Sequence, residues 1–514
     1  MKTIKTTITS VAAATLLAIA AQTANAEKPE TDNHLVILHT NDTHSRIDPD
    51  EKDRGGILRR KVLIDSVRAE RRNVMLVDAG DAVQGTLYYS LFLGEVERKL
   101  MNALGYDIQI LGNHEFDNGM DVLAREWSQL NAECLSTNYD VRDTPLDTIV
   151  RPYTVREIDG KRIGFLAINL DPEGMISADN VRGLRFLDPV KAANATAWHL
   201  RNNLRCDLVV AVTHIGYANA HGTTDRDLAA ASEDIDIIIG GHTHTRVDPA
   251  DPTTPPSRVT NALGDTILIA QTGALGAQLG EIDIDLTSMR PSYRLISVDG
   301  RLDDRIDHEV AAILDPYRAS VDSILTLNIA KAPRALKKSD WSLVNYISDI
   351  VGDEGARLAG KKIDIALMNR GGIRCDLPAG NVTQGTIMQM MPFDNRIVVI
   401  ELSGADLAEA FNVMASRGGD GISAGARSGI DPDTKRATDI TIGGKPIEPE
   451  RTYTVATIDY LANGGDYMAS LKNGKEIARS ENILYIDVIN RLRRDNAAGK
   501  KATAKAEQRM TINK

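Results

Sequence analysis

The chain has 514 residues, of which 42% are hydrophobic and 25% are charged. A chain of this length is too long for one ordinary core, so two domains are expected, and its composition excludes a disordered protein. The formal net charge of −11 disfavours a general binder of nucleic acid polymers, because such proteins use a basic surface. We therefore expect a folded protein that has no nucleic acid polymer as its partner.

Residues 1–26 are typical of a secretory signal peptide. Lys2 and Lys5 precede a short apolar stretch, and Ala24-Asn25-Ala26 forms a cleavage site of small residues. The apolar stretch is shorter than the ~20 residues that a spanning helix needs, and no later segment reaches that length. We expect cleavage near Ala26 and an exported protein, periplasmic or secreted, without a membrane span. A retained N-terminal anchor is the alternative.

Residues 27–305 alternate short β-type segments with helical ones, which predicts an α/β domain of sheets flanked by helices. The predicted strands cover residues 35–39, 73–77, 108–111, 163–168, 208–212, 235–239 and 266–270. Predicted helices include residues 56–71 and 187–203. Helical patterning over 307–325 places a linker helix or hinge at 306–335. A second α/β domain is expected over 336–514, with a solvated helical end at 491–505.

Five segments of the first domain share one design, in which an apolar strand is followed at once by side chains that can bind metal. These side chains are Asp42, His44, Asp81, Asn113, His114, Asp117, His214, His242 and His244. Ligands gather beyond the carboxyl ends of strands in α/β sheets, so we expect all five segments at one edge of one sheet. Each residue alone also fits an ordinary polar turn. The occurrence of five of the ten histidines in these segments favours a metal site.

The residue types indicate the chemistry of this site. Carboxylate, imidazole and amide oxygen donors suit Zn²⁺, Mn²⁺ or Fe²⁺, and there are enough donors for two ions. Asp81 lies on a short turn after Gly80 and can bridge both ions. Two ions about 3.5–4 Å apart can activate one water molecule and hold a phosphate group across them.

Together these segments resemble the signature of the calcineurin-like metallophosphoesterases. The motifs are Asp42-Thr43-His44, Gly80-Asp81, Gly112-Asn113-His114-Glu115, Thr213-His214 and Gly241-His242-Thr243-His244. The resemblance implies two divalent ions (Zn, Mn, Fe or Co), one bound by Asp42, His44, Asp81 and His244 and the other by Asp81, Asn113, His214 and His242. It also implies that His114 stabilises the phosphoryl transition state and that Asp117 orients His114. An imidazolium beside a developing anion is a sound electrostatic stabiliser.

Three segments of the second domain resemble the nucleoside-recognition segments of the 5′-nucleotidase family, which includes periplasmic UDP-sugar hydrolases and animal ecto-5′-nucleotidases. They are residues 369–374 (NRGGIR), 391–395 (MPFDN) and 460–466 (YLANGGD), and the resemblance spans about residues 35–470. It implies that Phe393 and Tyr460 stack on the base and that Asp466 accepts hydrogen bonds from the ribose. Asn369 and Asn395 would make further polar contacts, and Arg374 would bind a phosphate or ribose oxygen.

Two departures from this family pattern bear on the substrate site. Tyr460 stands where the family commonly has Phe, so its hydroxyl can alter base preference. Val344-Asn345 replaces a pair that often includes an arginine for phosphate, so the phosphate clamp is expected to come from elsewhere.

We therefore expect a two-metal hydrolase that releases phosphate from nucleoside 5′-monophosphates by attack of a metal-bound hydroxide. Other 5′-nucleotides and UDP-sugars are further candidate substrates. The alternative is a 2′,3′-cyclic nucleotide phosphodiesterase with 3′-nucleotidase activity, against which the Gly371-Gly372-Ile373-Arg374 segment speaks. A nucleotide-binding protein without activity is disfavoured, because no ligand position is lost. The three cysteines form no disulfide framework but leave open one bridge between Cys134 and Cys206.

Overall fold

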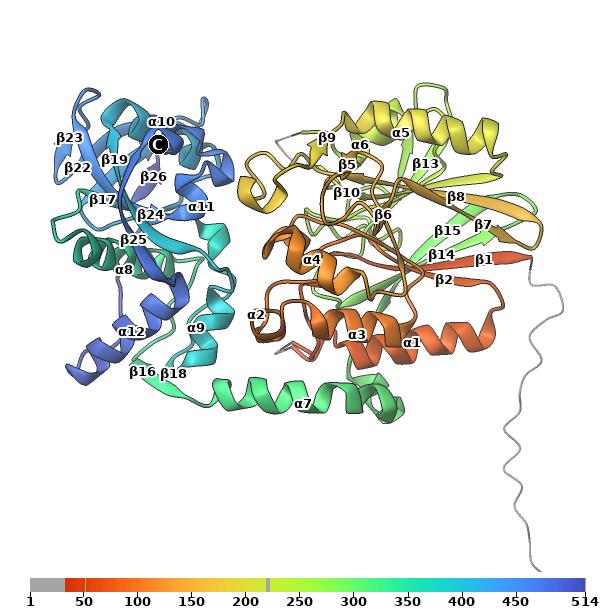
Figure 1. Cartoon of the computed structure of the whole chain (residues 1–514), viewed down its shortest axis with the longest axis horizontal. Helices are drawn as coiled ribbons and strands as arrows, with labels where there is room; N and C mark the ends of the chain where they lie inside the picture. The colour runs from red at the N-terminus through yellow and green to blue at the C-terminus, as the bar shows by residue number, and fades with distance from the viewer. Residues whose placement is uncertain (1–32, 51, 219–221, 514) are drawn as a thin grey trace, which may run out of the picture.

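The computed structural model describes residues 33–50, 52–218 and 222–513, so the expected signal peptide lies outside the described residues. The chain forms two α/β lobes, and the long helix α7 (His308–Leu325) runs along one side of both (Figure 1). This confirms the expected fold class. Within the described part of the chain, no helix has both the length and the apolar composition needed to cross a bilayer.

The first domain contains two sheets packed face to face. One has seven strands in the order β15 (Arg290–Ser297), β14 (Gln278–Asp285), β1 (His34–Thr40), β2 (Val74–Asp78), β3 (Ile108–Ile110), β4 (Glu133–Leu135) and β6 (Val150–Arg151). The other has six in the order β12 (Arg258–Thr260), β13 (Thr266–Ala270), β11 (Ile237–Ile239), β10 (Leu208–His214), β8 (Lys161–Asn169) and β7 (Tyr153–Ile158). Strands β1 to β4 are parallel, as are β8, β10, β11 and β13.

Both faces of the parallel strands are covered, which explains why these strands are nearly continuously apolar. On β1, Leu35 and Ile37 belong to the core between the sheets, whereas Val36 and Leu38 pack under helices. Helices α1 (Ile57–Glu70) and α3 (Glu95–Leu104) supply that outer layer. Helices α5 (Pro189–Trp198) and α6 (Asp225–Ala231) cover the outer face of the second sheet. The domain is therefore a four-layer sandwich.

The expectation that all five metal-ligand segments leave one sheet is wrong. The segments with Asp42, Asp81 and Asn113 follow β1, β2 and β3 of the seven-stranded sheet, but those with His214 and His242 follow β10 and β11 of the six-stranded sheet. They still meet, because the carboxyl ends of both sets of parallel strands lie at the same end of the sandwich. Strand alternation along the sequence does not show to which of two stacked sheets a strand belongs.

Helix α7 lies inside the connection expected at 306–335 and packs on the first domain. Arg318 Nε donates to Asp48 Oδ1 at 3.1 Å. The ring of Tyr317 packs against that of Phe92 on α2 (Leu87–Phe92), with the ring centroids 4.8 Å apart. Strand β16 (Asn328–Ala332) then pairs with β18 (Gly380–Thr383). We therefore propose that the second domain begins with β16, earlier than residue 336.

The second domain is built around a five-stranded sheet in the order β20 (Gly421–Ile422), β17 (Ile365–Met368), β24 (Thr452–Ile458), β19 (Arg396–Ser403) and β25 (Lys475–Ile483). A smaller sheet contains β23 (Lys445–Pro446), β22 (Ala437–Ile442), β21 (Ala426–Ile430) and β26 (Met510–Ile512). The helices are α8 (Ser342–Ala359), α9 (Gln384–Met390), α10 (Gly404–Ser416), α11 (Asp459–Ala462) and α12 (Leu484–Ala497).

One prediction needs correction, and one question that the sequence left open is answered. The helical end expected at 491–505 stops at Ala497, because Gly499 takes a left-handed φ of 76° and the chain returns to pair β26 with β21. The disulfide left open between Cys134 and Cys206 is not formed, since both residues are free and buried.

Candidate metal centre and substrate cavity

The loops after β1, β2 and β11 share an uncommon backbone conformation. Asp42, His44, Asp81, His242 and His244 have φ angles of 49°, 47°, 54°, 81° and 53°. Left-handed φ angles are costly for residues other than glycine and cluster at functional sites. Five of the seven predicted metal ligands therefore sit on strained backbone.

Two glycines allow these loops to approach one another closely. A Cβ atom on Gly112 would lie 2.2 Å from Asp81 Oδ1, and one on Gly80 would lie 2.8 Å from His214 Nδ1. Any larger residue would push the Asp81 turn away from its neighbours.

Asp81 lies at the centre of the cluster. Its Oδ2 atom is 3.2 Å from His214 Nε2 and 3.9 Å from His44 Nε2, while its Oδ1 atom accepts from the backbone N–H of His114 at 2.9 Å. Burial acts to raise the pKa of Asp81, but the imidazoles of His214 and His114 outweigh burial and hold the pKa well below its usual range. Asp81 Oδ2 is therefore close to histidines that end or follow strands of both sheets.

Asp42, His44 and His244 form one group of donor atoms. The Nε2 atoms of His44 and His244 are 2.9 Å apart, and Asp42 Oδ1 is 3.5 Å from His244 Nε2. Burial lowers the pKa of His244 to about 4 and that of His44 well below its ordinary value, so both rings are neutral at pH 7. Two neutral rings and a carboxylate within 4.8 Å of one another fit a divalent cation.

His214, Asn113 and His242 form a second group of donor atoms. His214 Nδ1 bonds to the carbonyl oxygen of Ala79 at 2.7 Å, so Nδ1 carries hydrogen and Nε2 faces Asp81. Burial lowers the pKa of His214, but the charges of Asp81 and Asp42 outweigh burial and raise it to about 10. This environment attracts a positive charge. His242 Nδ1 lies 3.1 Å from Asn113 Oδ1 and completes the donor set.

His114 and Asp117 form the expected pair, with His114 Nδ1 2.9 Å from Asp117 Oδ2. Burial acts to lower the pKa of His114, but the charges of Asp117 and Asp81 outweigh burial and raise it. The ring lies 5.3 Å from that of His44, so an imidazolium would stand directly beside the candidate metals.

Glu115 is a functional residue to which sequence reasoning assigned no role. Its buried carboxylate accepts from the backbone N–H groups of Asp81 at 3.0 Å, Ala82 at 2.9 Å and Gly112 at 2.6 Å. It thereby joins the loops after β2 and β3. Its place after His114 was the only sequence signal, because two of its three partners, the backbone groups of Asp81 and Ala82, lie 34 and 33 positions away in the chain.

A cavity of about 550 Å³ lies between the two domains and opens onto the candidate metal centre. It is lined by Asp81, Asn113, His114, Asp117, Met175, Ile176, Ser177, Asp179, Asn180, His242 and His244 of the first domain and by Asn369, Gly371, Gly372, Arg374, Phe393, Asp394, Asn395, Asp459, Tyr460, Asn463, Asp466 and Arg479 of the second. All six residues expected to bind substrate are among them. The wall formed by residues 175–180 was not foreseen.

Residues of the second domain reach the metal centre directly. The ring of Phe393 lies 5.8 Å from that of His114, and the Arg374 guanidinium lies 5.8 Å from the Phe393 ring. By contrast, Val344 and Asn345 are buried in α8, where Asn345 Nδ2 donates to Glu507 O at 2.7 Å. Their positions therefore contribute nothing to the cavity.

Asp466 is held by both domains. Its carboxylate accepts from Asn369 Nδ2 at 2.7 Å and lies 3.1 Å from the Tyr460 hydroxyl. Its backbone N–H donates to Gly174 O of the first domain at 2.7 Å. The Tyr460 hydroxyl lies 3.1 Å from the same Gly174 oxygen.

Comparisons with known proteins agree with this architecture. Residues 35–246 match the calcineurin-like phosphoesterase family, and residues 321–473 match the 5′-nucleotidase C-terminal domain. The chain is 28% identical over 504 residues to a 5′-nucleotidase of Vibrio parahaemolyticus, and the match covers 90% of each protein. It is 27% identical to the trifunctional nucleotide phosphoesterase protein of Bacillus subtilis, covering 93% of this chain but 35% of that longer protein.

Among solved structures, the 5′-nucleotidase precursor of Thermus thermophilus superposes with a TM-score of 0.82 at 27% identity, covering 93% of this chain and 99% of that one. The two-sheet fold and its ligand loops define a metallophosphoesterase, and the protein is a metal-dependent phosphoric ester hydrolase. It belongs to the 5′-nucleotidase family, with a calcineurin-like phosphoesterase domain followed by a 5′-nucleotidase C-terminal domain.

Proposed function

We propose that the enzyme hydrolyses nucleoside 5′-monophosphates to nucleoside and phosphate. The observation that carries this proposal is the composition of the 550 Å³ cavity, which has metal-ligand residues on one wall and Phe393, Tyr460 and Asp466 on the other. A phosphate on the first wall and a nucleoside on the second would bring the scissile bond beside His114. The names of the relatives, which include 5′-nucleotidases, support the same substrate class.

One cation would be held by Asp42, His44, Asp81 and His244, and another by Asp81, Asn113, His214 and His242. The donor set of imidazole, carboxylate and amide oxygen fits zinc, manganese, iron or cobalt. When bound, two such ions lower the pKa of an attacking water molecule and stabilise charge on the phosphoryl oxygens.

The protein groups around that centre bind and orient the substrate. His114, as an imidazolium held by Asp117, would donate a hydrogen bond to the oxygen on which charge develops, and Arg374 would attract the phosphate. Phe393 and Tyr460 would stack on the base. Asp466 and Asn369 are already joined by a hydrogen bond, which orients the carboxylate for the ribose hydroxyls. Asn395 would supply a further polar contact from the cavity wall.

The test is phosphate release from a substrate panel supplied with Mn²⁺, Zn²⁺ or Co²⁺ in turn. We expect AMP to be hydrolysed far faster than 3′-AMP or 2′,3′-cyclic AMP, with other 5′-nucleotides and UDP-glucose as secondary substrates. Preference for 3′-AMP would favour the cyclic-nucleotide alternative instead. Undiminished AMP hydrolysis by chelator-treated protein would contradict the metal-dependent mechanism.

We also propose that the enzyme acts outside the cytoplasm after cleavage near Ala26. The basic start, the apolar stretch and the small-residue site of residues 1–26 support this. N-terminal sequencing of the enzyme recovered from a cell-envelope extract should begin at Glu27.

A further inference from the structure

The loop that carries His44 needs support beyond its own backbone. Asp42, His44 and Ser45 have φ angles of 49°, 47° and 55°, which places three non-glycine residues in the left-handed region within four positions. On one side, His44 N–H donates to Asp81 O at 2.9 Å and Ser45 N–H donates to Ala82 O at 3.0 Å. The other side of the loop is held by side chains.

The Ser45 hydroxyl is the attachment point on that side. It donates to the carboxylate of Glu97, and its oxygen accepts from the Thr86 hydroxyl at 2.9 Å. All three side chains are buried. Ser45 is therefore held from outside its own loop by two side chains, Glu97 on α3 and Thr86.

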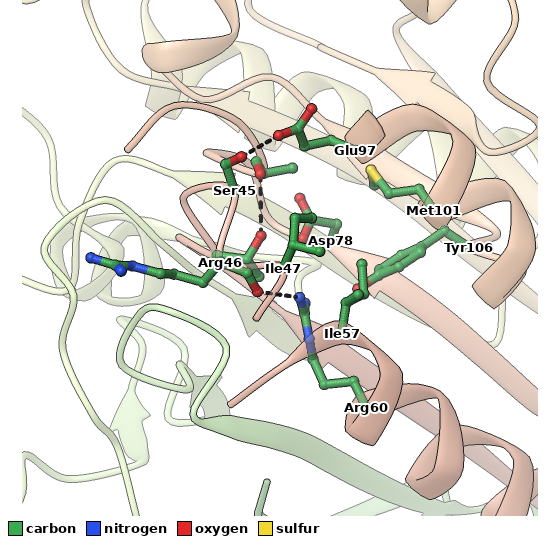
Figure 2. Close-up of a pocket in the computed structure, with 11 residues that line it drawn as sticks. Ser45, Arg46, Ile47, Ile57, Arg60, Asp78, Glu97, Met101 and Tyr106 are labelled. Atoms are coloured by element: carbon green, nitrogen blue, oxygen red, sulfur yellow. Dashed lines mark hydrogen bonds between the residues drawn. The ribbon is translucent and has the colours of Figure 1, made fainter. Parts of the chain in front are cut away.

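Glu97 lies on α3 with an exposure of 3%. Its side chain borders a small cavity of about 10 Å³, together with Arg60, Asp78 and Tyr106 (Figure 2). Among the described residues, none lines both this small cavity and the cavity between the domains. Glu97 therefore cannot act by touching a substrate bound there.

A buried carboxylate is costly unless its hydrogen bonds repay the loss of water. At this position on α3, among Met101 and other apolar neighbours, a leucine would pack without that cost. The hydrogen bond to Ser45, one residue after His44, explains why a carboxylate occupies this position, whereas packing alone does not.

We propose that Glu97 is a positioning residue of the metal centre. Through Ser45, it holds the strained His44 loop so that the ring of His44 faces His244. The inference rests on the proposed assignment of His44 as a metal ligand. Partners that orient metal ligands typically contribute about 10–100-fold to metal affinity, and the same range is expected here.

The test measures Co²⁺ binding to the metal-free protein by visible absorption. Glu97→Leu and Ser45→Ala should each weaken Co²⁺ binding by about 10–100-fold, and the double variant should bind as weakly as the weaker single variant. Glu97→Gln keeps an oxygen that can accept from Ser45, so it should restore most of the affinity. Glu95→Leu, on the same helix with a side chain 39% exposed, is the matched control and should bind like the wild type.

A role in folding alone predicts the opposite pattern, in which thermal unfolding of the metal-free variants shifts while Co²⁺ affinity stays unchanged. That pattern would overturn the inference, as would a folded Ser45→Ala variant with wild-type affinity. If Glu97→Leu does not fold, Ser45→Ala and Glu97→Gln decide the matter. A wild type that binds no Co²⁺ would instead sink the proposed function, and this inference with it.

Discussion

The Nε2 atoms of His44 and His244 lie 2.9 Å apart, although 200 positions separate the two residues in the chain. His44 follows β1 of the seven-stranded sheet, and His244 follows β11 of the six-stranded sheet. The pair therefore joins the two sheets at one end of the sandwich. Two neutral imidazoles with facing nitrogens attract a cation, and this gives the first prediction.

Metal binding should stabilise the fold in addition to activating the enzyme, because the expected ligands come from both sheets. A divalent ion at 100 times its Kd is expected to add about 2.7 kcal/mol to the free energy of unfolding. Urea unfolding of metal-free protein, with and without added Mn²⁺, measures the gain. The Asp81→Ala variant should show little gain, whereas Asp65→Ala, a surface change, should behave like the wild type. Equal stability with and without Mn²⁺ would contradict metal binding between the sheets.

His114→Asn should lower kcat for AMP by about 10²–10³-fold, the loss typical when one donor to a transition-state oxygen is removed. Metal content, measured by elemental analysis, should not change, because the assigned ligands are intact. His199→Asn is a control, since His199 contacts Tyr153 away from the centre. An unchanged kcat would show that His114 does not stabilise the transition state.

Phe393→Ala should reduce kcat/KM for AMP by about 5–150-fold, corresponding to the ~1–3 kcal/mol that stacking on one base contributes. Hydrolysis of ribose 5-phosphate, which has no base, should fall much less. A similar loss with both substrates would mean that Phe393 supports the metal wall through its contact with His114 instead of binding the base.

His39 provides a pH prediction that is independent of the active site. The ring is fully buried, stacks on Tyr293 with centroids 5.7 Å apart, and has its pKa lowered by burial to about 3. In the unfolded chain the His39 ring takes up a proton near pH 6.5, whereas in the folded protein it stays neutral down to about pH 3. The protein therefore loses stability as pH falls below 6.5. From pH 7 to pH 5 this group accounts for about 2 kcal/mol of lost stability.

Unfolding by urea at pH 7 and at pH 5, in the presence of saturating metal, compares wild type with His39→Gln. The loss of stability between the two pH values should be about 2 kcal/mol smaller in the variant. Identical losses would show that His39 is protonated at pH 5 in the folded protein.

Much of the candidate site was predictable because its signals are local. A buried strand followed by a turn that carries Asp or His can be recognised within about ten residues, and five such segments in order predict a two-metal centre. Gly80 and Gly112 precede Asp81 and Asn113, and the structure shows that they permit close approach of the loops. The strands predicted for the first domain also lie within two or three residues of the observed ones.

Local patterns were therefore sufficient to predict the kind of donor atoms and their attachment to strand ends. The packing of distant segments established the remaining relationships. It assigned the segments to two sheets, placed Phe393 beside His114, and put Glu115 and Glu97 behind the ligand loops. Periodicity and turn chemistry act between neighbours in the chain, whereas these contacts arise from the packing of surfaces. A carboxylate that binds distant backbone groups leaves no local pattern.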